Sequence, residues 1–247
     1  MSDEVEYDAI AGHYQQSKLL PFRVEIERYS LFERMGDLRG KRILDLACGE
    51  GIYSREMKRR GAATVHGVDL STAMIELALQ AEQREPLGCT YQVCDVAQLG
   101  KLGDFDLVVG CYLLNYARTR EQLLAFCRAI RRNLAPGARF VSINDNPRNA
   151  VEHFDTYRPY GFIKQLGAPR MEGAPIVYTM FNPDGTSFQF TNYDLAPETY
   201  EWAFREAGFS SFEWLPLKAQ HGSRNEVAGY WRHFLDTAPI TLMEARV

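Results

Sequence analysis

Three aspartates each end a short apolar segment, and two glycines come directly after the first of them. Asp45 ends the run ILD, Asp69 ends VHGVD and Asp95 ends QVCD. Gly49 and Gly51 lie in the turn ACGEG that follows Asp45. In an open α/β sheet such turns hold nucleotide-like cofactors, and an acidic residue after the second strand accepts hydrogen bonds from ribose hydroxyls. The spacing therefore predicts a site for a cofactor that contains a nucleoside.

The charges at this turn narrow the class of cofactor. Asp45 precedes the two glycines and Glu50 lies between them. Carboxylates at this position repel a pyrophosphate and favour a cationic ligand. S-adenosylmethionine (SAM) carries an ammonium and a sulfonium group and no phosphate, so SAM fits the turn best.

Two other cofactor classes fit the same turn poorly. A dinucleotide fingerprint needs a third glycine, but GEGIYS has Ser54 there, and a phosphate loop needs Gly-Lys-Ser/Thr, which does not occur. Ala47 stands where a first glycine might be expected. A nicotinamide dehydrogenase is further disfavoured because the sequence has no catalytic His or Tyr/Lys signature.

Strand-like and helix-like segments alternate along the first 143 residues, and this alternation must position the aspartates. The pattern predicts βαβ units and a Rossmann-like α/β fold, with a seven-stranded, mostly parallel sheet and helices on both faces. The predicted strands are 41–48, 63–70, 89–96, 105–114 and 138–144, and the predicted helices are 51–60, 72–85 and 120–134. A helix and two further strands are expected after residue 196.

Residues 145–192 break this rhythm and are rich in proline, glycine and aromatic residues. The runs PIVYTMF and TSFQFTNY flank NPDG, which predicts an antiparallel hairpin. A long insertion at the carboxyl edge of the sheet is usually functional, so residues 145–192 are expected to form a substrate lid. About a third of its aromatic side chains should line a pocket, since alternate residues of a strand share a face. The whole chain is expected to form one domain, with residues 1–40 as a helical cap.

The strand ends supply the other predicted cofactor contacts. Leu70 and Met74 follow Asp69 and are expected to flank the adenine ring. Asp95 is expected to accept a hydrogen bond from the adenine amino group, with Val96 against the ring. The segment GCYLLNY, which contains Cys111, would pass below the cofactor.

The series DLACGEG, GVDLS, CDV, FDLVVGCYLLNY and LAPGARF resembles class I SAM-dependent methyltransferases over Arg42–Asn144. The segments YDAIA, LPFR and CYLLNYA are also similar to the N-methyltransferases that build toxoflavin-type azapteridines. This resemblance implies that Tyr14 and Arg23 bind the methionyl carboxylate, while Asp45 and the backbone of Ala47–Gly49 meet the amino group. It also suggests acceptor contacts from Tyr7, Asn115, Tyr116, Tyr178 and Trp231.

Composition excludes several other functions. A net charge of −4 and a pI near 5.8 do not indicate the basic surface that binds nucleic acid or an anionic membrane. The sequence has no apolar run of 18 residues and no Cys/His pattern of metal-ligand spacing. The acidic N-terminus does not resemble a signal peptide, and reduced cysteines are expected. These features predict a cytoplasmic monomer or weak homodimer that binds no metal.

The expected reaction is methyl transfer from SAM to a small aromatic heterocycle, with N-methylation of an azapteridine-like secondary metabolite favoured. A weakly basic ring nitrogen needs no dedicated strong base, whereas a hydroxyl acceptor does, and no general base stands out in the sequence. Two alternatives remain open: O-methylation of a phenol or carboxylic acid, and SAM binding without methyl transfer.

Overall fold

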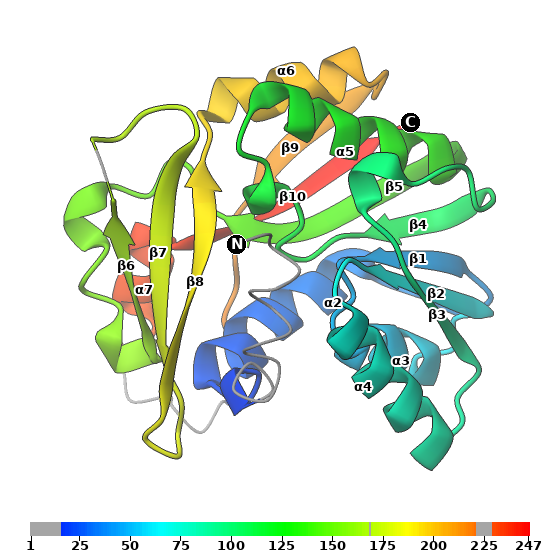
Figure 1. Cartoon of the computed structure of the whole chain (residues 1–247), viewed down its shortest axis with the longest axis horizontal. Coiled ribbons are helices and arrows are strands. Elements are labelled where there is room, and N and C mark those ends of the chain that lie inside the picture. Colours follow the sequence, from blue (N-terminus) through cyan, green and yellow to red (C-terminus); the bar gives the residue numbers. More distant parts are fainter. Residues whose placement is uncertain (1–15, 168, 221–228) are drawn as a thin grey trace.

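The computed structural model describes residues 16–167, 169–220 and 229–247. A seven-stranded sheet with the order β3-β2-β1-β4-β5-β10-β9 forms the centre of the described chain (Figure 1). β10 is antiparallel to both β5 and β9, whereas the pairs among β1–β5 are parallel. The strands are β1 Arg42–Leu46, β2 Thr64–Asp69, β3 Cys89–Val93, β4 Phe105–Val109, β5 Leu134–Asp145, β9 Ser211–Leu215 and β10 Ile240–Arg246.

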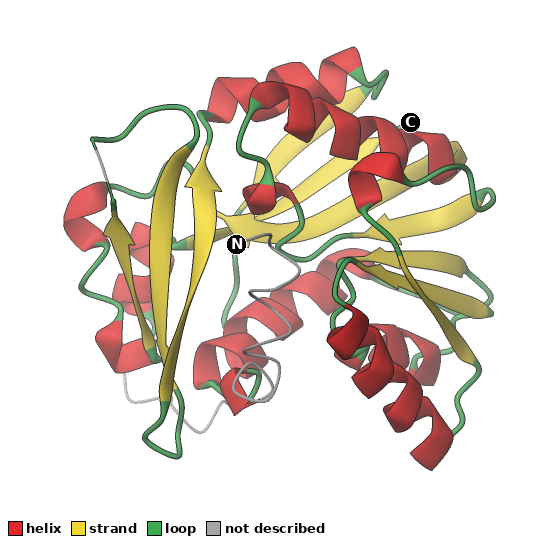
Figure 2. Ribbon diagram, viewed as in Figure 1, coloured by secondary structure: helices red, strands yellow, loops and turns green. Residues whose placement is uncertain are grey.

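Helices cover both faces of this sheet, which confirms the predicted Rossmann-like architecture (Figure 2). The helices on one face are the π-helical turn η1 Arg23–Arg28, α2 Tyr29–Met35, α3 Ile52–Arg59 and α4 Thr72–Arg84. The helices on the other face are α5 Arg120–Asn133 and α6 Pro197–Glu206, and the short α7 Arg232–Thr237 precedes β10. Four 3-10 turns are η2 Val96–Gln98, η3 Leu114–Tyr116, η4 Val151–His153 and η5 Arg158–Tyr160.

Side-chain caps begin α4 and α5. Ser71 accepts a hydrogen bond from the Met74 N–H at the start of α4, and Thr119 accepts one from the Gln122 N–H at the start of α5. Each bond satisfies one backbone donor that the helix itself leaves unpaired. Gly36 ends α2 with a φ of 65°. Local sequence therefore fixes where these helices begin and end.

A second, antiparallel sheet of three strands stands beside the main sheet (Figure 1). Its strands are β6 Phe162–Leu166, β7 Ala174–Phe181 and β8 Ser187–Asp194, and β7 with β8 forms the predicted hairpin. Along β8, buried and more exposed residues alternate, so one face of the small sheet is packed.

The boundaries differ from the prediction at several places. β6 and α7 had not been predicted, because five- and six-residue elements carry too little periodicity. β5 begins at Leu134, before the Pro136-Gly137 pair that was expected to precede the strand. The strand expected at 210–219 ends at Leu215, where Pro216 has no N–H to continue the ladder.

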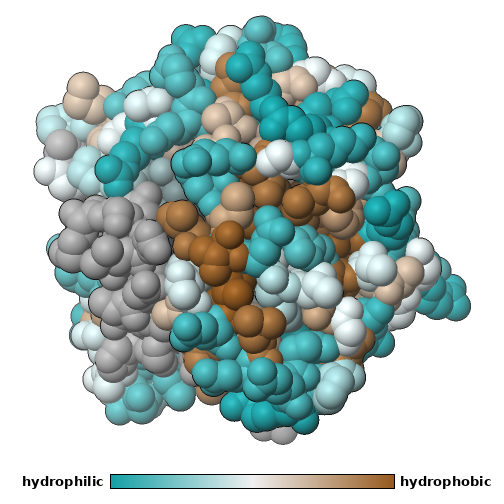
Figure 3. Space-filling view, turned by 45° about the vertical axis from the view of Figure 1, so that its right-hand side comes forward, coloured by the Kyte–Doolittle hydropathy of each residue, from teal (hydrophilic) through white to brown (hydrophobic). Residues whose placement is uncertain are grey.

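Apolar side chains gather across the middle of one face of the molecule, with hydrophilic surface around them (Figure 3). The exposed large apolar residues of the described chain are Leu19, Leu70, Leu79, Val93, Leu102, Val151 and Met171. Leu70 follows β2 directly, so the apolar surface of the fold includes the edge where the strands end.

Candidate active site

The loop between β1 and α3 folds through left-handed backbone conformations. Ala47, Gly49 and Gly51 have φ values of 55°, 54° and 78°. A Cβ on Gly51 would lie 2.5 Å from the Tyr91 hydroxyl, so only glycine fits there. Ala47 takes up the same strained conformation with a side chain, which costs on the order of 1 kcal/mol. Ala47 therefore keeps the left-handed conformation that a glycine would adopt without strain, and it differs from glycine only in its side chain.

Asp69 at the end of β2 holds this loop in place. Its carboxylate accepts hydrogen bonds from the Gly49 N–H at 2.7 Å and from the Ser71 N–H at 3.0 Å. Burial raises the pKa of Asp69, although these backbone donors oppose that shift. The carboxylate thus joins the loop after β1 to the loop after β2.

A cavity of about 200 Å³ opens beside this loop, at the carboxyl ends of β1, β2 and β4. Eight of the predicted cofactor residues line the cavity: Ala47, Gly49, Asp69, Leu70, Met74, Asp95, Val96 and Cys111. Its lining in the described chain contains two carboxylates and no lysine or arginine. The lining therefore suits a cationic ligand with ribose hydroxyls and opposes a pyrophosphate, so the donor set fits SAM.

Asp95 also has a structural role at this cavity. Its side chain accepts hydrogen bonds from the Ala97 N–H at 2.9 Å and from the Gln98 amide at 3.1 Å, which caps η2. The cap fixes the carboxylate at the cavity wall beside Val96. One aspartate thus shapes the turn and faces the space that a ligand would occupy.

Asp45 lies behind the cavity wall rather than on it. It is 2% exposed, and its carboxylate accepts a hydrogen bond of 2.6 Å from the Ser54 hydroxyl. Burial, together with the nearby charge of Asp69, raises the pKa of Asp45 to about 7. Ser54, which differs from the dinucleotide fingerprint, is thus the direct partner of this carboxylate.

Arg23 belongs to a buried cluster on η1. Its guanidinium forms an ion pair with Glu27 at 3.0 Å and lies 5.1 Å from the centre of the Tyr112 ring. Glu27 is fully buried and also accepts hydrogen bonds from the hydroxyls of Tyr53 and Tyr112. Arg23 does not line the first cavity, where the predicted contact with a methionyl carboxylate would place it.

A second, narrower cavity of about 20 Å³ adjoins the first. Tyr112 and Tyr116 line both cavities, so the two spaces meet at these rings. The second cavity is otherwise lined by Phe22, Arg23, Phe162, Tyr178, Met180, Phe190, Asn192 and Ile240. The loop after β4 therefore lies between a cavity that carries two carboxylates and a mainly aromatic one.

Three near-parallel rings of the small sheet form one wall of the second cavity. Tyr178 and Phe190 are directly opposite each other on β7 and β8, with ring centres 5.1 Å apart and planes 9° apart. Phe162 on β6 stacks on Tyr178 at 6.0 Å and 22°. Because Phe162 and Phe190 cover both faces of the Tyr178 ring, this ring can meet a flat ligand only with its edge, in the edge-to-face arrangement that aromatic pairs also favour.

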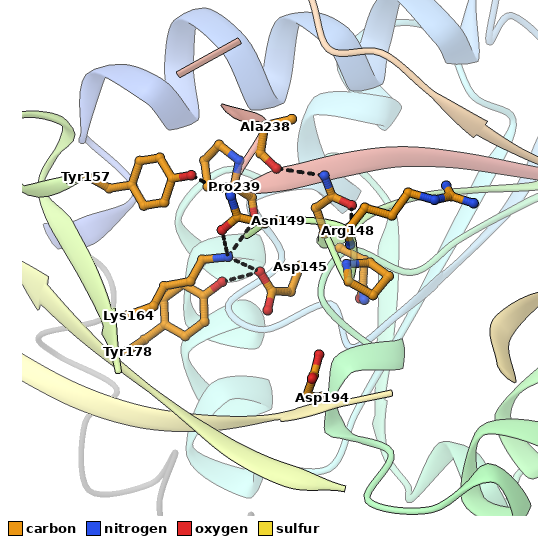
Figure 4. A network of polar contacts seen from close by, with 12 residues as sticks. Asp145, Arg148, Asn149, Tyr157, Lys164, Tyr178, Asp194, Ala238 and Pro239 are labelled. Carbon is orange, nitrogen blue, oxygen red and sulfur yellow. Dashed lines mark hydrogen bonds and ion pairs between the residues drawn. The ribbon is translucent and has the colours of Figure 1, made fainter. Parts of the chain in front are cut away.

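A buried ion pair joins the small sheet to the main sheet behind this wall (Figure 4). The Lys164 ammonium on β6 contacts the Asp145 carboxylate at the end of β5 at 2.5 Å. It also donates to the Asn149 side chain at 3.1 Å and to the Pro239 carbonyl at 2.8 Å. The Tyr178 hydroxyl donates to the same Asp145 oxygen at 2.5 Å. Burial lowers the pKa of Lys164, although Asp145 opposes that shift.

Four of the remaining predicted residues are placed as follows. Within the described chain, the buried side-chain amide of Asn115 has no hydrogen-bond partner, and this side chain lines neither cavity. Trp231 donates to Glu25 at 3.0 Å and lines neither cavity. Tyr7 and Tyr14 lie outside the described residues.

Sequence reasoning missed Gln122 and Phe126 of α5 in the first cavity, and it also missed residues of the small sheet and η1. Asn192, Phe190 and Glu27 carried no motif. The only available signals were the alternation along β8 and the i, i+4 spacing of Arg23 with Glu27.

The helices within the described residues are too short or too polar to span a bilayer. Over the same residues, no group of three or more His, Cys, Asp or Glu side chains is arranged to hold a metal ion.

Comparison with known proteins agrees with this geometry. A family profile described as a methyltransferase domain matches residues 43–137. The chain is 31% identical over 169 residues to the N-demethylindolmycin N-methyltransferase of Streptomyces griseus, and the match covers 68% of each chain. It is 32% identical over 122 residues to the ubiquinone biosynthesis O-methyltransferase of Acinetobacter baylyi, of which the match spans only half.

A solved structure shows the same fold. The DhpI–SAM–HEP complex aligns over 100% of this chain and 99% of its own, with a TM-score of 0.63 and 17% sequence identity. The extended match to the indolmycin enzyme, the methyltransferase profile and the fold agree with the glycine loop and the acidic cavity. The chain therefore belongs to the class I SAM-dependent methyltransferases, and its cofactor is SAM.

Proposed function

We propose that the protein transfers the methyl group of SAM to a ring nitrogen of a small aromatic heterocycle, with an azapteridine-like secondary metabolite as the favoured acceptor. The observation that carries the proposal is the second cavity. Stacked aromatic rings form one of its walls, and it adjoins the first cavity at Tyr112 and Tyr116. At about 20 Å³ this cavity would have to widen to admit a flat acceptor, which would then lie beside the SAM cavity. The indolmycin relative, by its name, is also an N-methyltransferase.

The cofactor roles proposed for the first cavity follow from its lining. Asp69 would accept the ribose hydroxyls, and Asp95 would accept the adenine amino group. Leu70, Met74 and Val96 would flank the adenine ring, while Cys111 would pass below the cofactor. Asp45 would contribute from behind the loop. Its carboxylate is near enough to Asp69 that, when ionised, it would make the potential at the cavity more negative.

SAM supplies an electrophilic methyl group that its own positive charge activates. The protein's task is then to align the acceptor with that methyl group and to exclude water, and alignment of this kind lowers a barrier by roughly 7 kcal/mol or more in well-oriented systems. Tyr112 and Tyr116 would set the approach of the acceptor from the second cavity to the first.

O-methylation of a phenol is the second candidate, and Tyr178 is the observation that favours it. Tyr178 lines the acceptor cavity, and its hydroxyl donates to Asp145. A phenol needs a group that takes up its proton, and a tyrosine backed by a carboxylate offers a relay. The O-methyltransferase relative of Acinetobacter baylyi is consistent with this candidate.

Product analysis with radiolabelled SAM tests the proposal. The purified protein is incubated with an azapteridine, a simple pteridine, a phenol and an aromatic carboxylic acid, and release of S-adenosylhomocysteine (SAH) is followed for each. We expect release with the heterocycles. Turnover of the phenol alone would support O-methylation, and no turnover with any acceptor, despite tight SAM binding, would support a binding protein.

A further inference from the structure

Asn192 follows two aromatic side chains in the buried row of β8, and the row ends at Asp194. On β8 the side chains of Phe188, Phe190 and Asn192 alternate onto the buried face of the small sheet. Asn192 is 2% exposed and lines the second cavity. Its side-chain carbonyl oxygen has no hydrogen-bond partner in the described chain.

A buried amide of this kind is costly to the fold. Leaving a buried acceptor unpaired forfeits its hydration without a compensating hydrogen bond. Asparagine is also among the residues least suited to a strand. Residue 192 faces Ile176 across the ladder, so the main-chain pairing does not require an amide. A ligand that enters the cavity would supply the missing donor.

Arg23 brings the opposite polarity to the same cavity. Its guanidinium can only donate hydrogen bonds, whereas the orphaned atom of Asn192 can only accept one. The rest of the lining is apolar apart from tyrosine hydroxyls. A flat ligand that packs against this wall and offers both a donor and an acceptor on its edge would match this pair.

We infer that Asn192 selects acceptors with a lactam-type ring N–H, which donates to the Asn192 carbonyl oxygen. The lactam carbonyl oxygen is the matching acceptor for Arg23. This inference rests on the proposed function, because it takes the second cavity as the acceptor site. It narrows the acceptor from any flat heterocycle to one that carries an N–H beside a carbonyl group.

Two isosteric bicyclic probes test the inference in SAH-loaded protein. Quinolin-2(1H)-one has a lactam N–H, and coumarin has a ring oxygen at the same place. Calorimetry should show that the wild type binds the lactam about 10- to 100-fold more tightly than coumarin, since a site built for an N–H rejects the analogue without it. Asn192→Leu should lose this preference, and Asn192→Asp should keep part of it.

Gln189→Leu is the matched control, because Gln189 lies on the exposed face of the same strand. This variant should keep the lactam preference. Equal binding of both probes to the wild type, or an unchanged preference in Asn192→Leu, would overturn the inference and leave the proposed function intact. Failure of both probes to bind the SAH-loaded wild type would count against the proposed function itself.

Discussion

The Tyr112 hydroxyl donates a hydrogen bond to the Glu27 carboxylate, and this contact holds the residue that divides the two cavities. Tyr112 has a φ of 60°, which is uncommon for a residue with a bulky side chain and costs on the order of 1–3 kcal/mol. Glu27 is fully buried on η1 and accepts a second hydrogen bond from Tyr53. Through Glu27, η1 thus fixes the position of Tyr112 between the two cavities.

Glu27→Gln should lower the stability of the folded protein. The variant removes the ion pair with Arg23 and replaces the charged acceptor of the two tyrosine hydroxyls with a neutral one. Loss of a partner from a buried ion pair typically costs about 3–5 kcal/mol in the free energy of unfolding. Urea unfolding checks the value. The control is Glu33→Gln, whose ion pair with Lys218 is exposed and should cost under about 1 kcal/mol. Equal losses in the two variants would contradict the role given to Glu27.

Asp69→Ala should weaken SAM binding strongly. The variant leaves the Gly49 and Ser71 N–H groups without their acceptor and removes the proposed ribose partner. We expect a loss of roughly 10- to 100-fold in affinity, measured by calorimetry. Asp104→Ala removes an exposed carboxylate before β4, at the opposite end of the strand, and should leave the affinity unchanged. Equal affinities for wild type and Asp69→Ala would show that Asp69 does not face the cofactor.

The raised pKa of Asp45 predicts a specific dependence of stability on pH. The folded pKa of about 7 exceeds the ordinary value, so the folded state binds more protons than the unfolded state between about pH 4 and 7. The free energy of unfolding should therefore fall as pH rises through this window, by up to about 4 kcal/mol from this group.

Asp45→Asn isolates that contribution, since asparagine has nearly the same shape and remains uncharged. Urea unfolding without SAM at pH 4.5, 6 and 8 should give a flatter profile for the variant and a more stable protein at pH 8. A profile that matches the wild type at all three values would contradict the burial of an ionisable group at this position.

Lys164→Met should destabilise the protein by about 3–5 kcal/mol, because Asp145 would remain buried without its cation. The double variant Lys164→Met/Asp145→Leu should recover part of this loss, since the lone buried charge is then gone. Urea unfolding of the two single variants and the double variant measures the coupling energy. Strictly additive losses would show that the ion pair does not couple the two sheets.

Much of the first cavity could be predicted from sequence because its residues are local to strand ends. Asp69 and Asp95 directly follow apolar strands, and the topology of a parallel sheet brings such positions to one edge. Met74 follows from the helix that Ser71 caps. The cavity needed no knowledge of long-range packing.

The second cavity could not be predicted without knowledge of long-range packing. Its walls come from η1, the loop after β4 and the three strands of the small sheet, which no sequence pattern brings together. Arg23 illustrates the difficulty: the sequence shows a helical arginine, but only packing reveals that it turns toward Glu27 and Tyr112. The prediction that about a third of the lid aromatics line a pocket agrees with Phe162, Tyr178 and Phe190, of which the sequence analysis had singled out only Tyr178.

The most direct test of the account follows the methyl group itself. The protein is incubated with SAM labelled with carbon-13 in its methyl group and with an azapteridine acceptor, and the product is examined by NMR. We predict a labelled methyl signal that couples to ring atoms adjacent to a nitrogen, with one SAH formed for each methyl group transferred. A labelled methoxy signal, or label that stays on SAM while the acceptor is unchanged, would contradict methylation of a heterocyclic nitrogen.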